Sequence, residues 1–338
     1  MGDSLLYKLN SGKPFKLWYL IKCYLSLLIP RCLYRFRREA LLKKAEKRED
    51  YSYILDRVDY YCKLSNPKPL PEKAVHDHLG YMYRFVDKWT KFHPKTFHKV
   101  YFFDLYEVMR YFSTSLRVSY LPGDVYITPE FPTIVKSRLL SENNENSVLL
   151  KLNKHRHFVF VNDTKPFCKK TPKAIFRGRI RRSRQREQFM QMYFGTDFCD
   201  CGIVGRNDEY PKEWITPKKT IREHLDYQYV IALEGNDVAT NLKWVMSSNS
   251  IAIMTRPTCE TWFMEGKLIP DYHYIEIKDD LSDLKEKMDY YSTHPDEAQQ
   301  IIEHAHEHVK QFLNTEREKL ISLLVAKKYF LNTSVTCH

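Results

Sequence analysis

Arginine is concentrated in one short segment of the chain. Six of the ten residues from 177 to 186 are arginine, and they follow an expected strand at 174–176. A guanidinium group binds phosphate oxygens in pairs, so this loop could neutralise a nucleotide without a metal ion. A solvated basic run or an electrostatic contact to nucleic acid would also account for these residues. Because no aromatic residues alternate with the arginines, and no RNA- or DNA-binding pattern occurs, base recognition is not predicted.

A glycine-containing turn between a strand and a helix forms a second candidate site. The strand is expected to end at Leu233, the turn covers residues 234–237, and the helix is expected over 238–246. Backbone N–H groups at a helix start, together with the helix dipole, suit a diphosphate. An ordinary strand-to-helix turn with Asn236 or Asp237 as N-cap explains the pattern equally well.

Three further basic residues could contact a donor or an acceptor. Lys136 and Arg138 lie on an expected loop flanked by proline, and Arg156 belongs to the basic segment 154–157. Solvated surface positions are the alternative for all three. The eight cysteines are scattered and do not have zinc-site spacing, so no metal ion is expected.

The composition is that of a folded, basic protein. The chain has 338 residues, with 54 Lys and Arg against 42 Asp and Glu, which gives a net charge of +12. This length indicates roughly two domains, and the charge favours partners that carry phosphate. Neither of the common glycine-rich phosphate-loop motifs, GxxxxGK[ST] and GxGxxG, occurs. Scattered cysteines in a chain of this size indicate reduced thiols and a cytosolic protein.

The first fifty residues form a basic arm that contains an apolar stretch. Residues 17–30 are mostly apolar but too few to cross a bilayer, and Lys22 interrupts them. Lysines and arginines lie on both sides, which is typical of an amphipathic helix lying on an anionic membrane surface. A helix packed on the protein with a solvated basic face is the alternative. The residues before the stretch are polar and no cleavage site follows it, so no signal peptide is expected.

Predicted strands and helices alternate through the rest of the chain, which indicates an α/β fold. Strands are expected at 99–103, 117–120, 125–128, 148–152 and 158–161, and again at 174–176, 227–233, 250–254 and 273–277. Helices are expected at 50–64, 105–113 and 185–193, from about 295, and from about 315 to 330. The predicted domains are a basic arm (1–50), an α/β acceptor-side domain (51–170), a Rossmann-like domain (171–314) and a C-terminal helix (315–338) that packs back on the acceptor-side domain.

Three segments together resemble glycosyltransferase family 90. They are FRGR with its following arginines, LEGNDVATNLKWVMSSNSIAIM, and ETWFMEGKLIPDYHYIEIKDDLSDL. The likeness covers about residues 95–330, is strongest over 173–285, and points to the bacterial lipopolysaccharide-modifying branch, with distant similarity to protein O-glucosyltransferases. It implies a GT-B fold, in which two Rossmann-like domains face a cleft. It also implies inverting transfer of a sugar from a UDP-sugar to a hydroxyl, with no essential metal and no cofactor.

The resemblance also assigns residues to the donor site. Arg186 resembles the arginine that holds the UDP diphosphate, and residues 236–241 resemble the loop and helix start that cradle it. Asn241 replaces an arginine of the protein O-glucosyltransferases, so a phosphate contact from Lys243 or Arg179 is expected. The implied donor-binding residues are Arg177, Gly178, Arg179, Arg186, Gly235, Asn236, Asp237, Val238, Ala239, Thr240, Asn241 and Lys243.

The catalytic base implied by the resemblance is an aspartate that follows a strand in the first domain. Asp104, directly after the expected strand 99–103, is the best match, and Asp124 is the second candidate. Such a carboxylate accepts the acceptor hydroxyl proton while arginines and a helix N-terminus stabilise the departing UDP. Asp104 could instead be the N-cap of a helix that begins at Leu105.

These observations predict an inverting UDP-sugar transferase that acts on a hydroxyl of a lipopolysaccharide or lipooligosaccharide core saccharide. The acceptor comes from the resemblance. The expected location is the inner face of the cytoplasmic membrane, bound peripherally to its anionic surface, with no nucleic-acid partner. The alternative is a non-catalytic basic module that binds nucleic acid or an anionic glycan. In that case the arginines of 177–186 would contribute in graded, salt-dependent steps, whereas a transferase would depend chiefly on Arg186.

Overall fold

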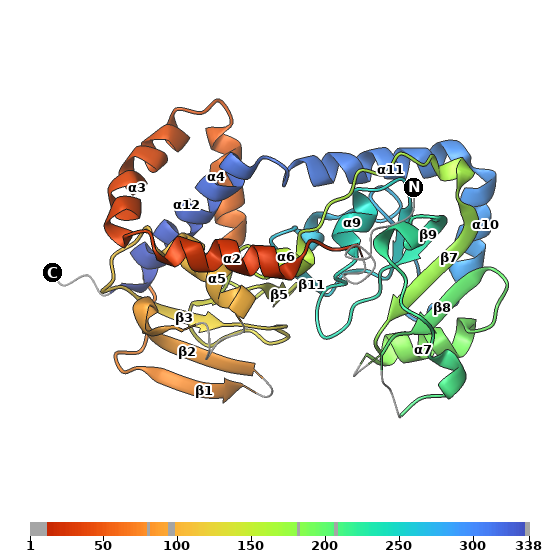
Figure 1. Ribbon diagram of the computed structural model, residues 1–338, viewed down its shortest axis with the longest axis horizontal. Helices are drawn as coiled ribbons and strands as arrows, with labels where there is room; N and C mark the ends of the chain where they lie inside the picture. Colours follow the sequence, from red (N-terminus) through yellow and green to blue (C-terminus); the bar gives the residue numbers. More distant parts are fainter. Residues whose placement is uncertain (1–11, 80–81, 94–98, 181–182, 206–208, 335–338) are drawn as a thin grey trace. The chain divides into compact units, whose positions relative to one another are not determined.

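The computed structural model describes residues 12–79, 82–93, 99–180, 183–205 and 209–334 (Figure 1). The chain divides into two compact units, and each is built from separate stretches of sequence. Unit 1 contains His155–Thr258, Glu265–Gln311 and the described residues up to Phe15. Unit 2 contains Lys16–Lys154, Cys259–Met264 and the residues from Phe312 onward. The chain is a mixed α/β protein with several sheets, as the alternation of predicted elements indicated.

Unit 1 is built on a five-stranded parallel sheet. The spatial order is β12-β10-β9-β7-β8. The first of these strands in the chain, β7, therefore lies between β8 and β9, which are the second and third in chain order. All the pairings are parallel, which requires crossover connections between the strands. The strands are β7 (Thr171–Gly178), β8 (Cys199–Ile203), β9 (Tyr227–Ile231), β10 (Ile251–Met254) and β12 (Ile275–Glu276).

Helices pack on the sheet of unit 1 and complete its core. Phe189 of α7, Met288 of α10 and Ile302 of α11 belong to the same buried cluster as the strand residues Phe176 and Ile231. Strands buried on both faces read as continuous apolar runs, which is why β9 and β10 could be predicted from sequence. The helical elements of this part of the chain are α6 (Lys154–His157), η2 (Phe167–Lys169), α7 (Arg184–Tyr193), η3 (Lys212–Trp214), α8 (Ile221–His224), α9 (Leu242–Met246), η4 (Glu265–Lys267), α10 (Leu284–Thr293) and α11 (Pro295–Lys310).

Unit 2 contains a second five-stranded sheet, in the order β1-β2-β3-β4-β6, and a two-stranded ribbon of β5 and β11. In the larger sheet β1, β2 and β3 pair antiparallel, whereas β3, β4 and β6 pair parallel. The strands are β1 (Val75–Leu79), β2 (Met82–Lys88), β3 (Arg117–Leu121), β4 (Thr133–Val135), β5 (Ser137–Leu139), β6 (Ser147–Leu149) and β11 (Cys259–Thr261). Its helical elements are α2 (Lys16–Leu27), α3 (Arg31–Glu46), α4 (Tyr51–Tyr61), η1 (Trp89–Lys91), α5 (Lys99–Met109) and α12 (Thr315–Thr333).

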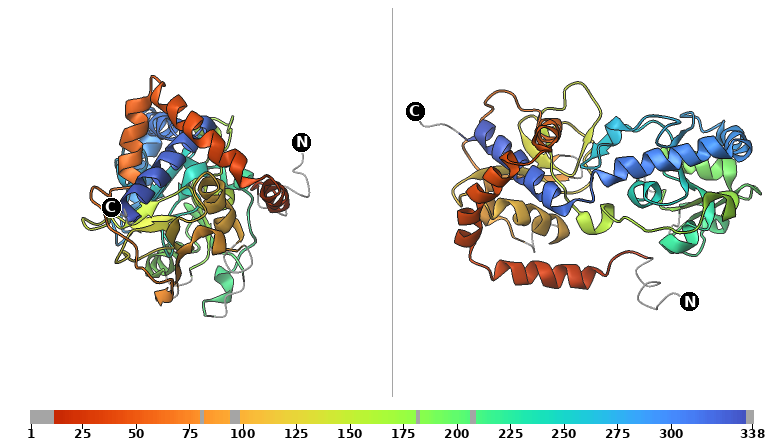
Figure 2. Two further views of the ribbon diagram at one scale, coloured as in Figure 1. Left: turned by 90° about the vertical axis from the view of Figure 1, so that its left-hand side faces the viewer. Right: turned by 90° about the horizontal axis from the view of Figure 1, so that it is seen from above.

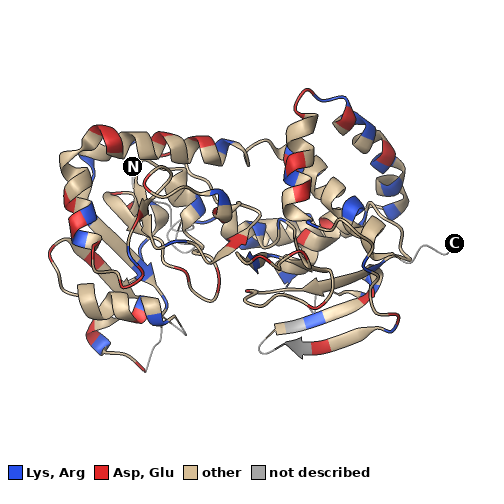
Figure 3. Ribbon diagram, turned by 180° about the vertical axis from the view of Figure 1, so that it is seen from behind, with Lys and Arg blue, Asp and Glu red and all other residues tan. Residues whose placement is uncertain are grey.

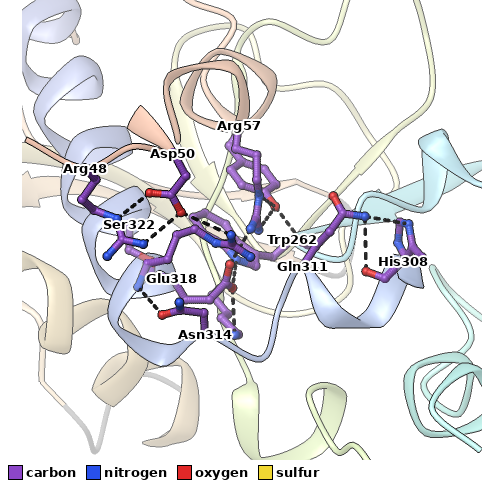
Figure 4. A network of polar contacts seen from close by, with 12 residues as sticks. Arg48, Asp50, Arg57, Trp262, His308, Gln311, Asn314, Glu318 and Ser322 are labelled. Atoms are coloured by element: carbon purple, nitrogen blue, oxygen red, sulfur yellow. Dashed lines mark hydrogen bonds and ion pairs between the residues drawn. The ribbon is translucent and has the colours of Figure 1, made fainter. Parts of the chain in front are cut away.

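A buried ion pair joins α4 to α12 in unit 2. The Arg57 guanidinium donates to Glu318 Oε1 at 2.6 Å, and Glu318 Oε2 accepts from the Trp262 indole N–H at 2.7 Å and from the Lys151 ammonium at 2.9 Å (Figure 4). The Arg57 and Glu318 side chains are only 1% and 5% exposed. Removing either member of such a pair leaves a buried charge, so α12 is held to the unit by more than apolar contact.

Several predicted elements differ from the structure. Residues 99–103, expected as a strand, form the first half of α5, and 125–128 and 158–161 are not strands. The run VYFF has aromatic and β-branched residues typical of strands, but a helix buried on most of its sides carries the same apolar run. The helix expected over 238–246 is confined to α9, because residues 234–241 continue as an extended turn.

The apolar stretch near the N-terminus forms α2, which ends before Pro30, and α3 begins directly after that proline. Proline lacks an N–H and disfavours a helical residue before it, which explains the break. Among the residues that the structure describes, no helix has both the length and the hydropathy needed to cross a bilayer.

Candidate active site

The strand order of unit 1 places its most promising site at the carboxyl ends of β7 and β9. These strands are neighbours in the sheet, and the order reverses between them, because β8 lies on one side of β7 and β9 on the other. In open parallel sheets ligands bind beside the strand ends at such a reversal. Here β7 ends at Gly178 and β9 at Ile231, so the described residues that follow, 179–180 and 183–186 after β7 and 232–237 after β9, meet at this point.

Arg186 fixes the two segments to each other. Its guanidinium donates to the Leu233 carbonyl at 2.7 Å and to the Arg179 carbonyl at 2.9 Å. The guanidinium lies so close to Gly235 that a Cβ atom there would approach Arg186 Nη2 to 3.1 Å. Glycine at 235 therefore allows the arginine to lie against the backbone of the turn.

Ser183 begins helix α7 at the same place. Its hydroxyl accepts from the Arg186 backbone N–H at 3.4 Å and donates to the Glu234 carbonyl at 3.1 Å. Arg179 is exposed, and its guanidinium lies 3.4 Å from the position a Cβ on Gly205 would take. The start of the ten-residue helix α7, the fixed Arg186 and the exposed Arg179 together form a positive surface suited to a phosphate group. Arg181 and Arg182 of the predicted cluster lie outside the described residues.

Two of the predicted donor residues point away from this surface into ion pairs. Arg177 donates to Asp200 of β8, whose other carboxylate oxygen accepts from the Tyr227 hydroxyl at 2.5 Å. Lys243 of α9 is fully buried against the Glu265 carboxylate. Both cations are already neutralised by neighbouring carboxylates, so the structure does not bring them to the phosphate surface.

The other residues predicted to bind the donor shape the turn after β9. The Asn241 amide donates to the Ile231 carbonyl at 2.9 Å, and the Gly235 N–H donates to the Asp237 carbonyl at 2.9 Å. At Gly178 a Cβ would come within 2.7 Å of the Phe176 ring, so a larger residue there would displace that buried ring. Of the rest, Asn236 is exposed, Thr240 is half-buried, and Val238 and Ala239 are buried.

Asp104, the first candidate for the base, lies in the middle of α5 instead of after a strand. Its carboxylate accepts from the Tyr19 hydroxyl at 2.6 Å and from the Lys154 backbone N–H at 2.9 Å. The Lys154 ammonium lies 3.4 Å from it, and the Asp104 side chain has no exposed surface. Burial raises the pKa of Asp104, and the Lys154 ammonium opposes that rise. Both carboxylate oxygens are engaged within the unit, so neither the strand-end nor the N-cap expectation describes this residue.

A hollow of about 190 Å³ borders Asp104 and is lined by α5, residues 150–154 and α12. Its charged groups are largely paired with one another. The Lys154 ammonium lies 2.5 Å from the Glu107 carboxylate, and Lys151 donates to Glu318 at 2.9 Å. The hollow is therefore polar but has little net charge.

Asp124, the second candidate, lies three residues after β3. Gly123 before it has a φ of +108°, which favours glycine and turns the chain sharply. The carboxylate accepts from the Lys136 ammonium at 2.7 Å, and the Ser137 hydroxyl accepts from the next backbone N–H, that of Val125, at 3.2 Å. Lys136 is 1% exposed, whereas the Asp124 side chain keeps 26% exposure. The segment at the start of β5 thus holds the carboxylate in place and leaves part of it accessible.

The last two predicted contacts have different surroundings. Arg138 is fully buried and donates to Glu260 Oε1 at 2.7 Å and to the Tyr60 carbonyl at 2.8 Å, which ties β5 to β11 and α4. Arg156 is exposed in α6. Arg138 is thus engaged inside unit 2, whereas the Arg156 side chain is exposed.

Comparisons with known proteins show which family this chain resembles. Residues 150–329 match the model of glycosyl transferase family 90. An O-glucosyltransferase, LpsA of Dichelobacter nodosus, is 38% identical over 328 residues, which cover 94% of this chain and 97% of the relative. This chain belongs to glycosyltransferase family 90. Protein O-glucosyltransferase 3 of Rattus norvegicus is 28% identical over 164 residues, or 47% of this chain and 32% of that protein. The human protein of that name is 27% identical over the same share.

Family membership confirms the resemblance seen in the sequence and makes this protein an enzyme that transfers sugar. It favours the enzymatic prediction over a non-catalytic basic module. The structure also shows four residues of this family 90 enzyme that hold predicted site residues in place and that the sequence did not indicate. Ser183 could have been found as a helix N-cap, since serine precedes the helical segment. Ser137, Asp200 and Glu265 had no such signal, because each acts through a partner distant in sequence.

Proposed function

We propose that this family 90 enzyme transfers glucose from UDP-glucose, with inversion, to a hydroxyl of a lipopolysaccharide or lipooligosaccharide core saccharide. The observation that carries the proposal is the Arg186 guanidinium, held between the ends of β7 and β9 and against Gly235. The relative that matches almost the whole chain is an O-glucosyltransferase, which supports glucose as the transferred sugar.

In this proposal unit 1 binds the donor. The diphosphate of UDP lies at the start of α7, where Arg186 and the exposed Arg179 stabilise the charge that develops as UDP leaves. Arg186 contributes most to this stabilisation, because its guanidinium is already held in position before the donor binds. The turn that contains Gly235 lies against Arg186 and keeps its guanidinium at the strand ends. A positive site of this kind stabilises UDP as a leaving group without a metal ion.

We assign the general base to Asp124 instead of Asp104. Asp124 meets the expectation of an aspartate that follows a strand, and its carboxylate is partly exposed. The acceptor hydroxyl gives its proton to this carboxylate while its oxygen forms the new bond to the anomeric carbon. The bond from that carbon to the β-phosphate oxygen breaks, and UDP departs with the electron pair. The sugar passes through an oxocarbenium-like transition state, as in glycoside hydrolysis.

The proposal implies a GT-B enzyme. The Rossmann-like domain of 171–314 binds the donor, the domain of 51–170 supplies the base and the acceptor site, and Arg156 contacts the acceptor. A lipid-linked acceptor requires the enzyme at a membrane surface. We therefore place it peripherally on the inner face of the cytoplasmic membrane, bound through the arm of residues 1–50.

A UDP-release assay on the full chain tests the proposal. We expect slow release from UDP-glucose, little from other UDP-sugars, acceleration by a truncated lipopolysaccharide core, and no effect of EDTA. Arg186→Lys should abolish most of the release, whereas Arg184→Lys, at an exposed position in the same run, serves as the matched control. Absence of both UDP binding and UDP release would refute the donor site.

A further inference from the structure

The exposed apolar side chains of this protein gather near its N-terminus. Of the twenty large apolar residues exposed in the described parts of the chain, nine lie between Leu17 and Phe36. The largest exposures are 68% for Trp18, 58% for Leu25, 77% for Leu28 and 87% for Phe36. Exposed apolar side chains gathered in one segment indicate a site of interaction.

In the described residues, helix α2 packs on the rest of unit 2 through the face that carries Tyr19 and Tyr24. The Tyr19 hydroxyl donates to Asp104 at 2.6 Å, and the Tyr24 ring meets Phe103 edge-on with ring centroids 4.9 Å apart. No residue of α2 is buried, and the helix lies at the edge of the unit (Figure 2). Trp18, Ile21 and Leu25 recur at helical spacing and project from the side opposite Tyr19. The packed face and the exposed apolar face are thus different faces of one helix.

The charged residues of this segment are mostly basic, and the first acidic one after residue 12 is Glu39, which pairs with Arg38 at 2.8 Å. From residue 12 to residue 38 the sequence has seven Lys or Arg and neither Asp nor Glu. Lys22, Arg35 and Arg37 are exposed, and basic residues continue along α3 (Figure 3). Apolar side chains beside exposed positive charge complement an anionic bilayer, whose surface is negative and whose interior is apolar.

We propose that α2 and the first turns of α3 lie in the plane of an anionic bilayer, with Trp18, Leu25, Leu28 and Phe36 inserted below the headgroups. Lys22 and the arginines of α3 contact lipid phosphates. The inference specifies the membrane contact of the proposed function and rests on it for the lipid-linked acceptor. The hydrogen bond from Tyr19 to Asp104 joins the inserted helix to α5, so the bilayer contact lies next to the core of unit 2.

Vesicle co-sedimentation of the full chain tests this surface. Wild type should bind vesicles of phosphatidylcholine with phosphatidylglycerol, bind pure phosphatidylcholine much less, and be released by high salt. The double variant Leu25→Glu/Leu28→Glu should bind anionic vesicles at least about tenfold more weakly. Ile269→Glu, which changes a residue 53% exposed in unit 1, is the matched control and should bind like wild type.

Trp18 reports insertion directly. Trp89, Trp244 and Trp262 are buried, and Trp214 is half-buried in unit 1. Lipids brominated in their acyl chains should therefore quench chiefly Trp18, and Trp18→Phe should remove most of the quenching. Equal vesicle binding by wild type and the double variant would overturn the proposal. So would a wild-type dimer that the double variant converts to a monomer in the absence of vesicles.

Activity separates this inference from the proposed function. The double variant should release UDP at the wild-type rate with a soluble core saccharide as acceptor. Vesicle binding without UDP release would refute the proposed donor chemistry and leave the membrane contact supported. UDP release without vesicle binding by wild type would refute the membrane contact alone.

Discussion

The two candidate bases should respond in opposite ways to the same substitution. Asp124→Asn removes a partly exposed carboxylate but keeps an oxygen that can accept from Lys136, which lies 2.7 Å away. Asp104→Asn removes a fully buried carboxylate whose two oxygens accept from Tyr19 and from the Lys154 backbone N–H. We therefore expect the first change to lower turnover and the second to lower stability.

The magnitudes follow from these contacts. Loss of a general base lowers kcat by about 10²- to 10⁴-fold, or roughly 3–5 kcal/mol of barrier. The stability lost by Asp124→Asn should lie below the ~3–5 kcal/mol typical of a broken buried ion pair, because this carboxylate is 26% exposed. At Asp104 an amide offers one acceptor oxygen where a carboxylate offered two. One buried donor then lacks a partner, which costs about 1–3 kcal/mol.

The burial of Asp104 reduces the loss of stability expected for Asp104→Asn. Burial raises the pKa of Asp104, so the ionised form is disfavoured in the folded protein, and a neutral amide regains part of that free energy. Lys154 also keeps its second partner, Glu107. We therefore expect Asp104→Asn to cost stability in the lower half of the range of about 1–3 kcal/mol. The molecules that remain folded should have a kcat within about threefold of wild type.

Both variants should be measured in the same two assays. UDP release with saturating donor and a soluble core acceptor gives kcat, and urea unfolding gives stability. Circular dichroism at the assay temperature shows whether each variant is folded. A folded Asp104→Asn protein without turnover, beside an Asp124→Asn protein that turns over normally, would refute the assignment of the base.

Three further predictions concern unit 1. Arg186→Lys should lower kcat for UDP release by about 10²-fold or more, and Arg184→Lys by less than about twofold, so equal graded losses would argue against the assignment of Arg186. Gly235→Ala should push the Arg186 guanidinium by a few tenths of an ångström and raise KM for the donor several-fold, with unfolding unchanged; an unaltered KM would contradict that contact. Burial lowers the pKa of His224 below 6.5, so the unfolded chain binds a proton that the folded chain does not, and stability should fall as pH drops through 6.5. His224→Leu should reduce that fall between about pH 7.5 and 5.5 in urea unfolding, and an unchanged slope would contradict it.

The elements of unit 1 were largely predictable from sequence because a parallel sheet imposes clear signals. The apolar runs expected at 227–233 and 250–254 became β9 and β10, and the helix expected at 185–193 became α7. The strand order could not be predicted, since pairing depends on contacts between distant segments. That order is what places Arg186 and Gly235 at one point of the sheet.

Residue type did not reveal which charges were already paired. Lys243 lies in a segment that matches the donor motif, yet its ammonium is buried against Glu265, a partner 22 positions further along the chain. Arg138 pairs with Glu260 across a ribbon whose strands are more than a hundred residues apart. Strand propensity gave a wrong prediction at 99–103. The aromatic and β-branched residues there form part of helix α5, which is buried on most sides.

The discontinuous course of unit 2 constrains how the protein can be made and divided. Glu318, which neutralises Arg57, belongs to α12 near the end of the chain, whereas Arg57 is synthesised more than 250 residues earlier. A nascent chain on the ribosome therefore holds a guanidinium destined for the interior long before its counter-charge emerges. A stop codon after Gln311 would leave that charge permanently without its carboxylate. No single cut of the gene can release either unit whole, because both are assembled from separated stretches of sequence.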